Sequence, residues 1–349
     1  MSAGNQPADR RRAPGSISAV KTVGEVGERE LIAMFTTAAR SVGGSGDVVI
    51  GSGDDAAVFV PTGPVVVSTD TAVAGRHFRF DWSSPRQIGA RAVVQSAADI
   101  AAMGGVLTGV VVSIGCPPQT PVDRVLELNA GIVEQSHRYG ARVLGGDLVS
   151  SAEVVLTVTS LGVLEGTAAV ALVGAIAGDV LAVSGPLGGP AGGLAALSAV
   201  EHGADPGLLE QFADLVAAYR LPAPDLSQGR VAAVAGAHAM TDVSDGLVEE
   251  LITMSGASQV RLDVQSSAVP QASGLSELGA ALGVDPARWA LAGGEEHELL
   301  AAFEPAHVPA GWTVIGEVSV GGTIGDEAGA RVDGVPVGEI RGWQSFTDV

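Results

Sequence analysis

Residues 64–78 read PVVVSTDTAVAGRHF, and this stretch decides the fold expected for the first half of the chain. Its β-branched run predicts a strand, with Asp70 at the strand end or in the following turn. The preceding segment 47–60, DVVIGSGDDAAVFV, repeats the pattern of a β-branched run beside acidic residues. The following segment 86–103 is rich in alanine, has apolar residues at helical spacing, and ends at a glycine pair. Strands and a helix in succession predict an α/β fold.

The same alternation continues along the chain. Residues 28–39 and 121–139 are expected to be helices, 106–114 a buried strand, and ARVLGGD a strand that turns at Asp147. In the second half we expect a glycine-started helix in GGPAGGLAALSAVEHG, an acidic turn into a helix in TDVSDGLVEELITMSGAS, and a turn into a strand or helix in RWALAGGEEHELLAAF. The expected division is a disordered tail (1–22), an N-terminal α/β domain (23–168) and a C-terminal α/β domain (169–349).

Charge and composition limit the partners and the compartment. The 349 residues carry 19 basic and 39 acidic side chains, a formal charge of -20 that would repel nucleic acid and anionic membranes. Apolar runs are broken well short of a membrane span, and the N-terminus lacks a signal-peptide pattern. The single cysteine, Cys116, can form no internal disulfide and is either a buried filler or a nucleophile. These features predict a cytoplasmic protein without nucleic acid or membrane partners.

Seven aspartates lie in glycine-, serine- or alanine-rich settings. They are Asp54, Asp55, Asp70, Asp99, Asp147, Asp242 and Asp245. Any one of them could be a turn former or a helix cap. Together they indicate a site for hard cations, because Mg²⁺ commonly binds one or two carboxylates, water and phosphate oxygens.

Lysine is almost absent from the sequence, which restricts how the chain could handle ATP. Lys21 is the only lysine and lies in the expected tail, so neither a Walker A loop nor a protein-kinase strand lysine exists. Mg²⁺ would then have to neutralise the phosphates. The glycine-rich segments GSGD, LGGD and SGPLGGPAGGL could bring backbone N–H groups to phosphate oxygens, or could be tight turns.

Seven motifs in order resemble the thiamine-monophosphate kinases, within the aminoimidazole-ribonucleotide-synthetase-like superfamily. They are GDDAAVF, STDTAVAGRHF, QSAADIAAMGG, GGD, DVSDGL, ALAGGEEHEL and RGWQSF, and the resemblance runs from about residue 25 to 346. The resemblance implies a two-domain fold in which the N-terminal sheet forms a barrel-like interface of a homodimer. It also implies that ATP phosphorylates thiamine monophosphate to the diphosphate by direct in-line transfer with several Mg²⁺ ions, the last step of thiamine diphosphate biosynthesis.

The resemblance also implies a role for individual residues. Metal ligands would be Asp55, Ser68, Thr69, Asp70, Asp99, Asp147, Asp242 and Asp245. Among these, Asp70, Asp147 and Asp245 would be catalytic. Nucleotide contacts would be Gly146, Asp147 and Ser244, and thiamine-phosphate contacts would be His77, Glu295 and Trp343. An aromatic face such as that of Trp343 can stack on the cationic thiazolium ring, although this tryptophan could equally close the C-terminal core.

The chain departs from the family pattern at several positions. Where the family usually has an arginine at the domain junction, this chain has Leu172, and where it has an arginine after the P-x-P motif, this chain has Asp225. The usual GGEDYEL is replaced by GGEEHEL, which introduces Glu296 and His297. The usual Gly-Asp-Ser is replaced by Gly188, Gly189 and Pro190. Two alternatives therefore stay open. One is a superfamily relative acting on an amide, selenide or carbamoyl group. The cysteine-free C-terminus SFTDV disfavours the carbamoyl enzyme, and the position of Cys116 disfavours the selenide enzyme. The other is a metal- or nucleotide-binding protein without turnover.

Overall fold

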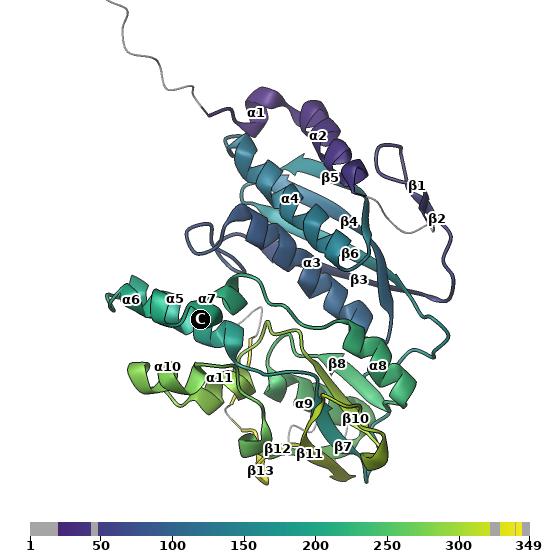
Figure 1. Cartoon of the computed structure of the whole chain (residues 1–349), viewed down its shortest axis with the longest axis vertical. Helices are drawn as coiled ribbons and strands as arrows, with labels where there is room; N and C mark the ends of the chain where they lie inside the picture. The colour runs from purple at the N-terminus through teal and green to yellow at the C-terminus, as the bar shows by residue number, and fades with distance from the viewer. Residues whose placement is uncertain (1–19, 43–47, 322–328, 339, 344–349) are drawn as a thin grey trace, which may run out of the picture.

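A four-stranded sheet forms the upper half of the molecule in Figure 1, a computed structural model that describes residues 20–42, 48–321, 329–338 and 340–343. Its order is β3-β6-β4-β5. The strands are β3 (Val65–Val73), β4 (Val106–Cys116), β5 (Arg142–Ser150) and β6 (Val155–Val163). β4 and β5 run parallel, whereas β6 pairs antiparallel with both β3 and β4. The two edge strands, β3 and β5, both carry residues of the predicted site.

Two helices cover one face of this sheet, α3 (Pro85–Ala102) and α4 (Val122–Arg138) (Figure 1). Ser84 caps α3 by accepting a hydrogen bond from Gln87 N, and proline occupies the first turn. The two helices pack closely because glycine faces backbone: a Cβ on Gly89 would lie 2.0 Å from Leu128 O. Val93 and Ile100 of α3 are fully buried. The predicted helices 86–103 and 121–139 are thus confirmed.

No described element covers the other face of the four-stranded sheet. Val67 on β3 is 59% exposed, and Val149 on β5 is 47% exposed. Between such apolar positions, the Oγ1 atoms of Thr69 and Thr159 lie 3.0 Å apart across β3 and β6. The sheet of one chain is open and forms no closed barrel within the described residues.

The N-terminal segment lies at the β5 edge of the same sheet. It comprises α1 (Val23–Val26), α2 (Glu28–Ser41), β1 (Val48–Ile50) and β2 (Val58–Phe59). The helix α2 contacts β5 and α4. Most of the predicted disordered tail lies outside the described residues, but Lys21 O accepts a hydrogen bond from Val122 N, and Thr22 forms a bridge with Pro121.

A seven-stranded sheet organises the second half, in the order β13-β12-β9-β11-β7-β10-β8. The strands are β7 (Val180–Val183), β8 (Ala239–Asp242), β9 (Val260–Val264), β10 (Leu299–Phe303), β11 (Thr313–Val320), β12 (Ala330–Val332) and β13 (Val335–Pro336). The helices are α5 (Gly189–Glu201), α6 (Gly207–Gln211), α7 (Ala213–Arg220), α8 (Ser227–Ala235), α9 (Leu247–Ser258), α10 (Leu275–Leu282) and α11 (Pro286–Ala292). The short 3₁₀ helices are η1 (Ser266–Ala268) and η2 (Pro305–His307).

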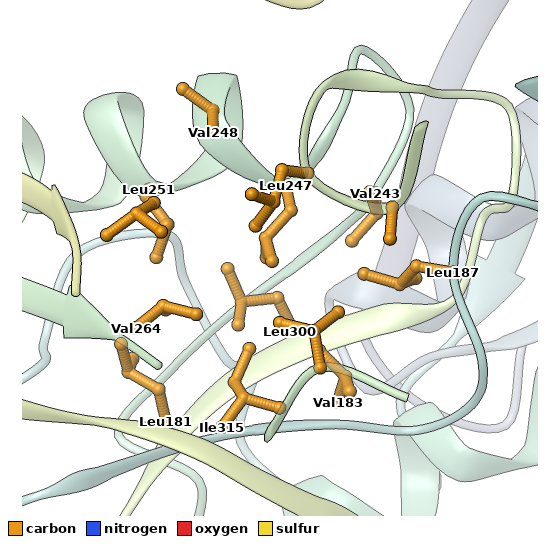
Figure 2. Packing of buried hydrophobic residues seen from close by; sticks show 14 of the residues in the cluster. Leu181, Val183, Leu187, Val243, Leu247, Val248, Leu251, Val264, Leu300 and Ile315 are labelled. Carbon is orange, nitrogen blue, oxygen red and sulfur yellow. The ribbon is translucent and has the colours of Figure 1, made fainter. Parts of the chain in front are cut away.

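The core of this second half lies between α9 and the sheet (Figure 2). Leu247 and Leu251, one helical turn apart, point from α9 toward Leu181 and Leu300, and all four side chains are fully buried. Replacing such a leucine by alanine typically costs about 2–5 kcal/mol. This packing fixes the start of α9, and therefore the acidic segment that precedes it.

Two expectations about aspartate positions were wrong. Asp70 lies within β3, paired with Val158, and not at its end. Asp147 lies within β5, because pairing with β4 continues past it as far as Ser150. A neighbouring strand with matching hydrogen-bonding groups extends these strands through polar residues that would end them in isolation. None of the helices within the described ranges is long and apolar enough to cross a membrane.

Candidate active site

Four of the predicted aspartates meet where the two halves touch. Asp70 on β3 and Asp99 on α3 come from the first half, and Ser68 Oγ donates a hydrogen bond to Asp99 Oδ2. Asp242 ends β8, and Asp245 lies in the bend before α9. The helix α3 contacts β8, so the acids of the two halves face one another. We call Asp70, Asp99, Asp242 and Asp245 the boundary acids.

The pKa values of the boundary acids record this crowding. Burial raises the pKa of Asp99 to about 7, and the charges of Asp242 and Asp70 add to the effect. Burial also raises the pKa of Asp70, with a further contribution from Asp242. For Asp245, burial and the charge of Glu295 raise the pKa in the same way. Such mutual repulsion is what a bound cation would relieve.

The segment 293–298 lies beside the boundary acids, because β10 pairs with β8 and places Leu299 opposite Asp242. Its backbone is strained: Glu295 has φ 71° and His297 has φ 56°, a conformation that L-residues rarely adopt. Two hydrogen bonds hold it, from Glu295 N to Ser244 O at 2.8 Å and from His297 N to Val243 O at 3.1 Å. The chain thus holds GGEEHE and DVSD together as one unit.

Two side chains of this segment carry opposite charges next to the boundary acids. His297 Nδ1 lies 3.0 Å from Asp242 Oδ2. Burial opposes the charged imidazolium, but the carboxylates of Asp242 and Glu295 raise the pKa of His297 to about 10. Burial would raise the pKa of Glu295, but Arg91 and His297 lower it well below its ordinary value. Both shifts favour the charged forms, the imidazolium of His297 and the carboxylate of Glu295.

The end of the described chain docks onto the same acidic bend. Trp343 N donates to Asp245 O at 2.9 Å, and Gly342 N donates to Glu249 Oε1 at 3.0 Å. A Cβ on residue 342 would lie 1.8 Å from Asp245 O, so only glycine fits there. The indole of Trp343, 39% exposed, lies with its centroid 6.2 Å from that of the His77 imidazole. Both aromatic rings therefore flank the site, and Trp343 is not a core residue.

Four other predicted residues lie away from the boundary acids. Asp70 is in register with Gly146 across β6 and β4. Three strand spacings of about 4.8 Å put these two backbones about 14 Å apart. Asp147 and Thr69 are exposed on the uncovered face of the sheet. Asp55 is exposed in the bend between β1 and β2, where a cavity lined by Asp54 also includes residues 142 and 143 of β5. We call Asp55, Gly146 and Asp147 the far-edge residues.

The sequence analysis missed three side chains that hold the site in place. Glu250 on α9, 8% exposed, accepts hydrogen bonds from Asp245 N at 3.3 Å and Ser244 Oγ at 3.4 Å. Burial raises the pKa of Glu250 to about 7. Arg91 and Gln95 on α3 both donate to Glu295 Oε2. A charged residue on the apolar stripe of a predicted helix was the available signal, because such residues are rarely buried unless paired.

The donor set of the boundary acids suits Mg²⁺ bound together with phosphate. Within the described part of the chain, no three histidine, cysteine, aspartate or glutamate side chains are placed to enclose an ion on their own. Mg²⁺ does not need such a cage, since it usually keeps water and substrate phosphate oxygens beside one or two carboxylates. Crowded carboxylates with raised pKa values, in a chain whose only lysine, Lys21, precedes α1, match that requirement.

Two of the four departures from the family motifs lie at the site and two do not. His297 contacts Asp242, and Glu296 Oε1 accepts a hydrogen bond from Gly188 N at 2.7 Å. Burial raises the pKa of Glu296 to about 8. Leu172 packs against the core of the second half. Asp225 lines a separate cavity of about 870 Å³ between α3, α4 and α8, which contains none of the boundary acids.

Comparisons with known proteins show which family the chain belongs to. Two family models match the chain: "AIR synthase related protein, N-terminal domain" at residues 53–164, and "AIR synthase related protein, C-terminal domain" at residues 177–327. The chain is 44% identical over 301 residues to the thiamine-monophosphate kinase of Mycobacterium tuberculosis (strain ATCC 25618 / H37Rv), covering 86% of each. It is 40% identical over 338 residues to that of Corynebacterium glutamicum, covering 95% of this chain and 97% of the relative.

A solved structure described as AaThiL complexed with AMPPCP and TMP has a TM-score of 0.73 and 27% identity. The superposition covers 94% of this chain and 100% of the solved chain. The order of the motifs, the meeting of the boundary acids and these likenesses lead to one conclusion: the chain is an enzyme of the thiamine-monophosphate kinase family, with the two-domain AIR synthase-like fold.

Proposed function

We propose that this protein uses ATP to phosphorylate thiamine monophosphate to thiamine diphosphate, the last step of thiamine diphosphate biosynthesis, in the cytoplasm. The observation that carries the proposal is the meeting of Asp70, Asp99, Asp242 and Asp245 at the boundary between the two halves. Several Mg²⁺ ions bound there would supply the positive charge that lysine supplies in other kinases. The proposed domains are residues 23–168 and 169–349.

The proposed reaction is a direct in-line transfer. An oxygen of the substrate monophosphate attacks the γ-phosphorus of ATP, the bond from that phosphorus to the bridging oxygen breaks, and ADP leaves with the electron pair. A phosphate monoester has its second pKa at about 6, so the attacking group is already ionised and needs no strong general base. In this proposal the boundary acids position the phosphates, and Ser244 contacts the nucleotide.

The substrate end of the site would be made by His77, Glu295 and Trp343. His77 Nδ1 accepts a hydrogen bond from Val73 N at 3.1 Å, which leaves Nε2 to donate to the substrate phosphate. Trp343, held by its backbone bond to Asp245 O, presents an aromatic face suited to a cationic ring. Glu295 supplies a carboxylate near Asp245, whose pKa its charge raises.

We further propose that the enzyme works as a homodimer whose N-terminal sheets meet in a barrel-like interface. The uncovered, partly apolar sheet face supports this proposal, since exposed apolar patches commonly mark interaction surfaces. Asp147 lies on the far edge of the sheet, about 14 Å or more from Asp70. Pairing the β3 edge with the β5 edge of a second copy would bring Asp147 of the partner subunit toward Asp70.

A nucleotide-binding protein without turnover is the second candidate. The observation that favours it is Leu172, which supplies no positive charge where an arginine is usual, and packs into the core instead. This candidate predicts that ATP with Mg²⁺ stabilises the fold but that no product forms.

The deciding experiment mixes purified protein with ATP, MgCl₂ and thiamine monophosphate and measures ADP and thiamine diphosphate together. Thiamine in place of the monophosphate, and a sample without magnesium, are the controls. Equal amounts of both products, formed only with magnesium, would support the kinase. Nucleotide-dependent stabilisation with neither product would favour the binding protein.

A further inference from the structure

One buried cation crosses from the first half of the molecule to the second. Arg91 on α3 is 6% exposed and reaches Glu295 in the strained segment 293–298. Its Nη1 donates to Tyr219 O at 3.1 Å, and its guanidinium carbon lies 5.1 Å from the centre of the Tyr219 ring. The tyrosine on α7 thus fixes the arginine, and the arginine in turn holds Glu295.

All the donors from α3 converge on one oxygen of Glu295. Oε2 accepts from Arg91 Nη2 at 2.6 Å, from Arg91 Nε at 3.2 Å and from Gln95 Nε2 at 2.8 Å. Among the described residues no hydrogen bond to Oε1 is found, and the side chain is 34% exposed. One oxygen is therefore saturated, and the other is left to accept a hydrogen bond from a bound molecule.

We propose that Arg91 and Gln95 are positioning residues for thiamine monophosphate. They hold the Glu295 carboxylate with Oε2 covered, so that Oε1 accepts one N–H of the substrate's amino-substituted ring. This inference rests on the proposed function, because it deepens the role given to Glu295. The same contacts come from α3, which also carries Asp99, so one helix sets the distance between the ring-binding carboxylate and the phosphate-binding acids.

A purely structural role for Arg91 makes a different prediction. A buried ion pair between two halves would affect folding and the affinity for both substrates alike. Positioning of one carboxylate oxygen affects the affinity for thiamine monophosphate alone. The Michaelis constants for the two substrates, measured on the same variants, therefore separate the two roles.

The test uses Gln95→Leu and Arg91→Lys, which keep most of the packing volume, in the full-length protein. Lysine keeps the charge but cannot donate two N–H groups in a fixed fork. We expect the KM for thiamine monophosphate to rise about tenfold in Gln95→Leu, and more in Arg91→Lys, since about 1.4 kcal/mol corresponds to tenfold. The KM for ATP should stay within about twofold. Arg86→Met is the matched control, because Arg86 makes ion pairs to Glu127 and Glu134 from the exposed side of the same helix.

Calorimetric titration with thiamine monophosphate alone gives a readout that needs no turnover. Weaker binding in Gln95→Leu, with wild-type binding in Arg86→Met, is the expected result. The positioning role would be overturned, and the kinase left intact, if Gln95→Leu and Arg91→Lys kept wild-type binding and KM for thiamine monophosphate while Glu295→Gln lost affinity for it. Absence of product from the wild-type protein would instead contradict the proposed function, while the titration would still decide the role of Gln95.

Discussion

The boundary acids and the far-edge residues have similar neighbours in the sequence but different surroundings in the structure. Asp70 and Asp99 are half-buried, repel one another and have raised pKa values. Asp55 and Asp147 are exposed, and each is near glycine or another small residue. The difference shows that one chain assembles only part of the predicted set, the part that needs both halves of the same molecule. The predictions below test whether the second set belongs to the same site.

The largest effect is expected at the boundary acids. Replacing Asp70 by Asn removes a negative charge that would bind Mg²⁺ and keeps the shape of the side chain. We expect kcat to fall on the order of 10³-fold, comparable to the loss of a group that stabilises developing charge. Steady-state production of ADP at saturating Mg²⁺ measures it. Asp81→Asn is the control, because Asp81 forms its ion pair with Arg79 outside the site; an equal loss there would remove the distinction.

The next effect concerns the far edge of the sheet. Asp147→Asn should lower kcat on the order of 10²-fold if Asp147 completes the site of a partner subunit. Mixing the inactive Asp70→Asn and Asp147→Asn proteins should then restore activity, because a mixed dimer contains one site with both natural acids. Random mixing makes about half of the dimers mixed, and each mixed dimer has one intact site out of two. About a quarter of the wild-type activity is therefore expected. No recovery from dimers shown to exchange subunits would mean that both acids serve the same protomer.

A smaller effect is expected where the chain end meets the acidic bend. Gly342→Ala places a methyl group against Asp245 O, which lies 1.8 Å from the ideal Cβ position. The clash should displace Trp343 from His77 and raise the KM for thiamine monophosphate about tenfold, with little change in thermal stability. Gly207→Ala is the control, since a Cβ there lies 3.5 Å from its nearest neighbour, an ordinary contact, and Gly207, like Gly342, does not have a positive φ. A large fall in melting temperature for Gly342→Ala alone would show that the bend itself, and not Trp343, was disturbed.

The periodicity of the sequence predicted most of the elements but not which acids would meet. The helices α3, α4 and α9 follow from apolar spacing and from the proline, serine and glycine residues at their ends. Asp70 and Asp147 were misplaced because strand pairing, which is a long-range interaction, extends strands through polar residues. Arg91 could not be assigned a partner, since Glu295 lies 204 residues away in the sequence. Local patterns define segments, whereas the domain boundary defines the site.

The smallest expected effect is on stability and has the opposite sign from the effect on activity. Burial and the charges of Asp242 and Asp70 raise the pKa of Asp99 to about 7, so ionising Asp99 costs more free energy in the folded state than in the unfolded chain. Because an unfolded aspartate ionises near pH 4, this cost grows between about pH 4 and pH 7 and is fully present at pH 8. Asp99→Asn removes the charge and should raise the melting temperature without Mg²⁺ at pH 8 by on the order of 2–4 °C.

Melting curves of the wild type and Asp99→Asn at pH 8 and pH 5.5, each with and without MgCl₂, measure this effect. The gain from Asp99→Asn should be smaller at pH 5.5, where the native carboxyl is already protonated. Mg²⁺ should stabilise the wild type more than the variant at pH 8, since a cation relieves the same repulsion that asparagine removes. Asp147→Asn should show neither gain, because Asp147 is exposed on the open face of the sheet. Equal gains in melting temperature from Asp99→Asn and Asp147→Asn would show that the charges of the boundary acids do not destabilise the folded protein. The boundary acids and the far-edge residues would then differ only in their positions.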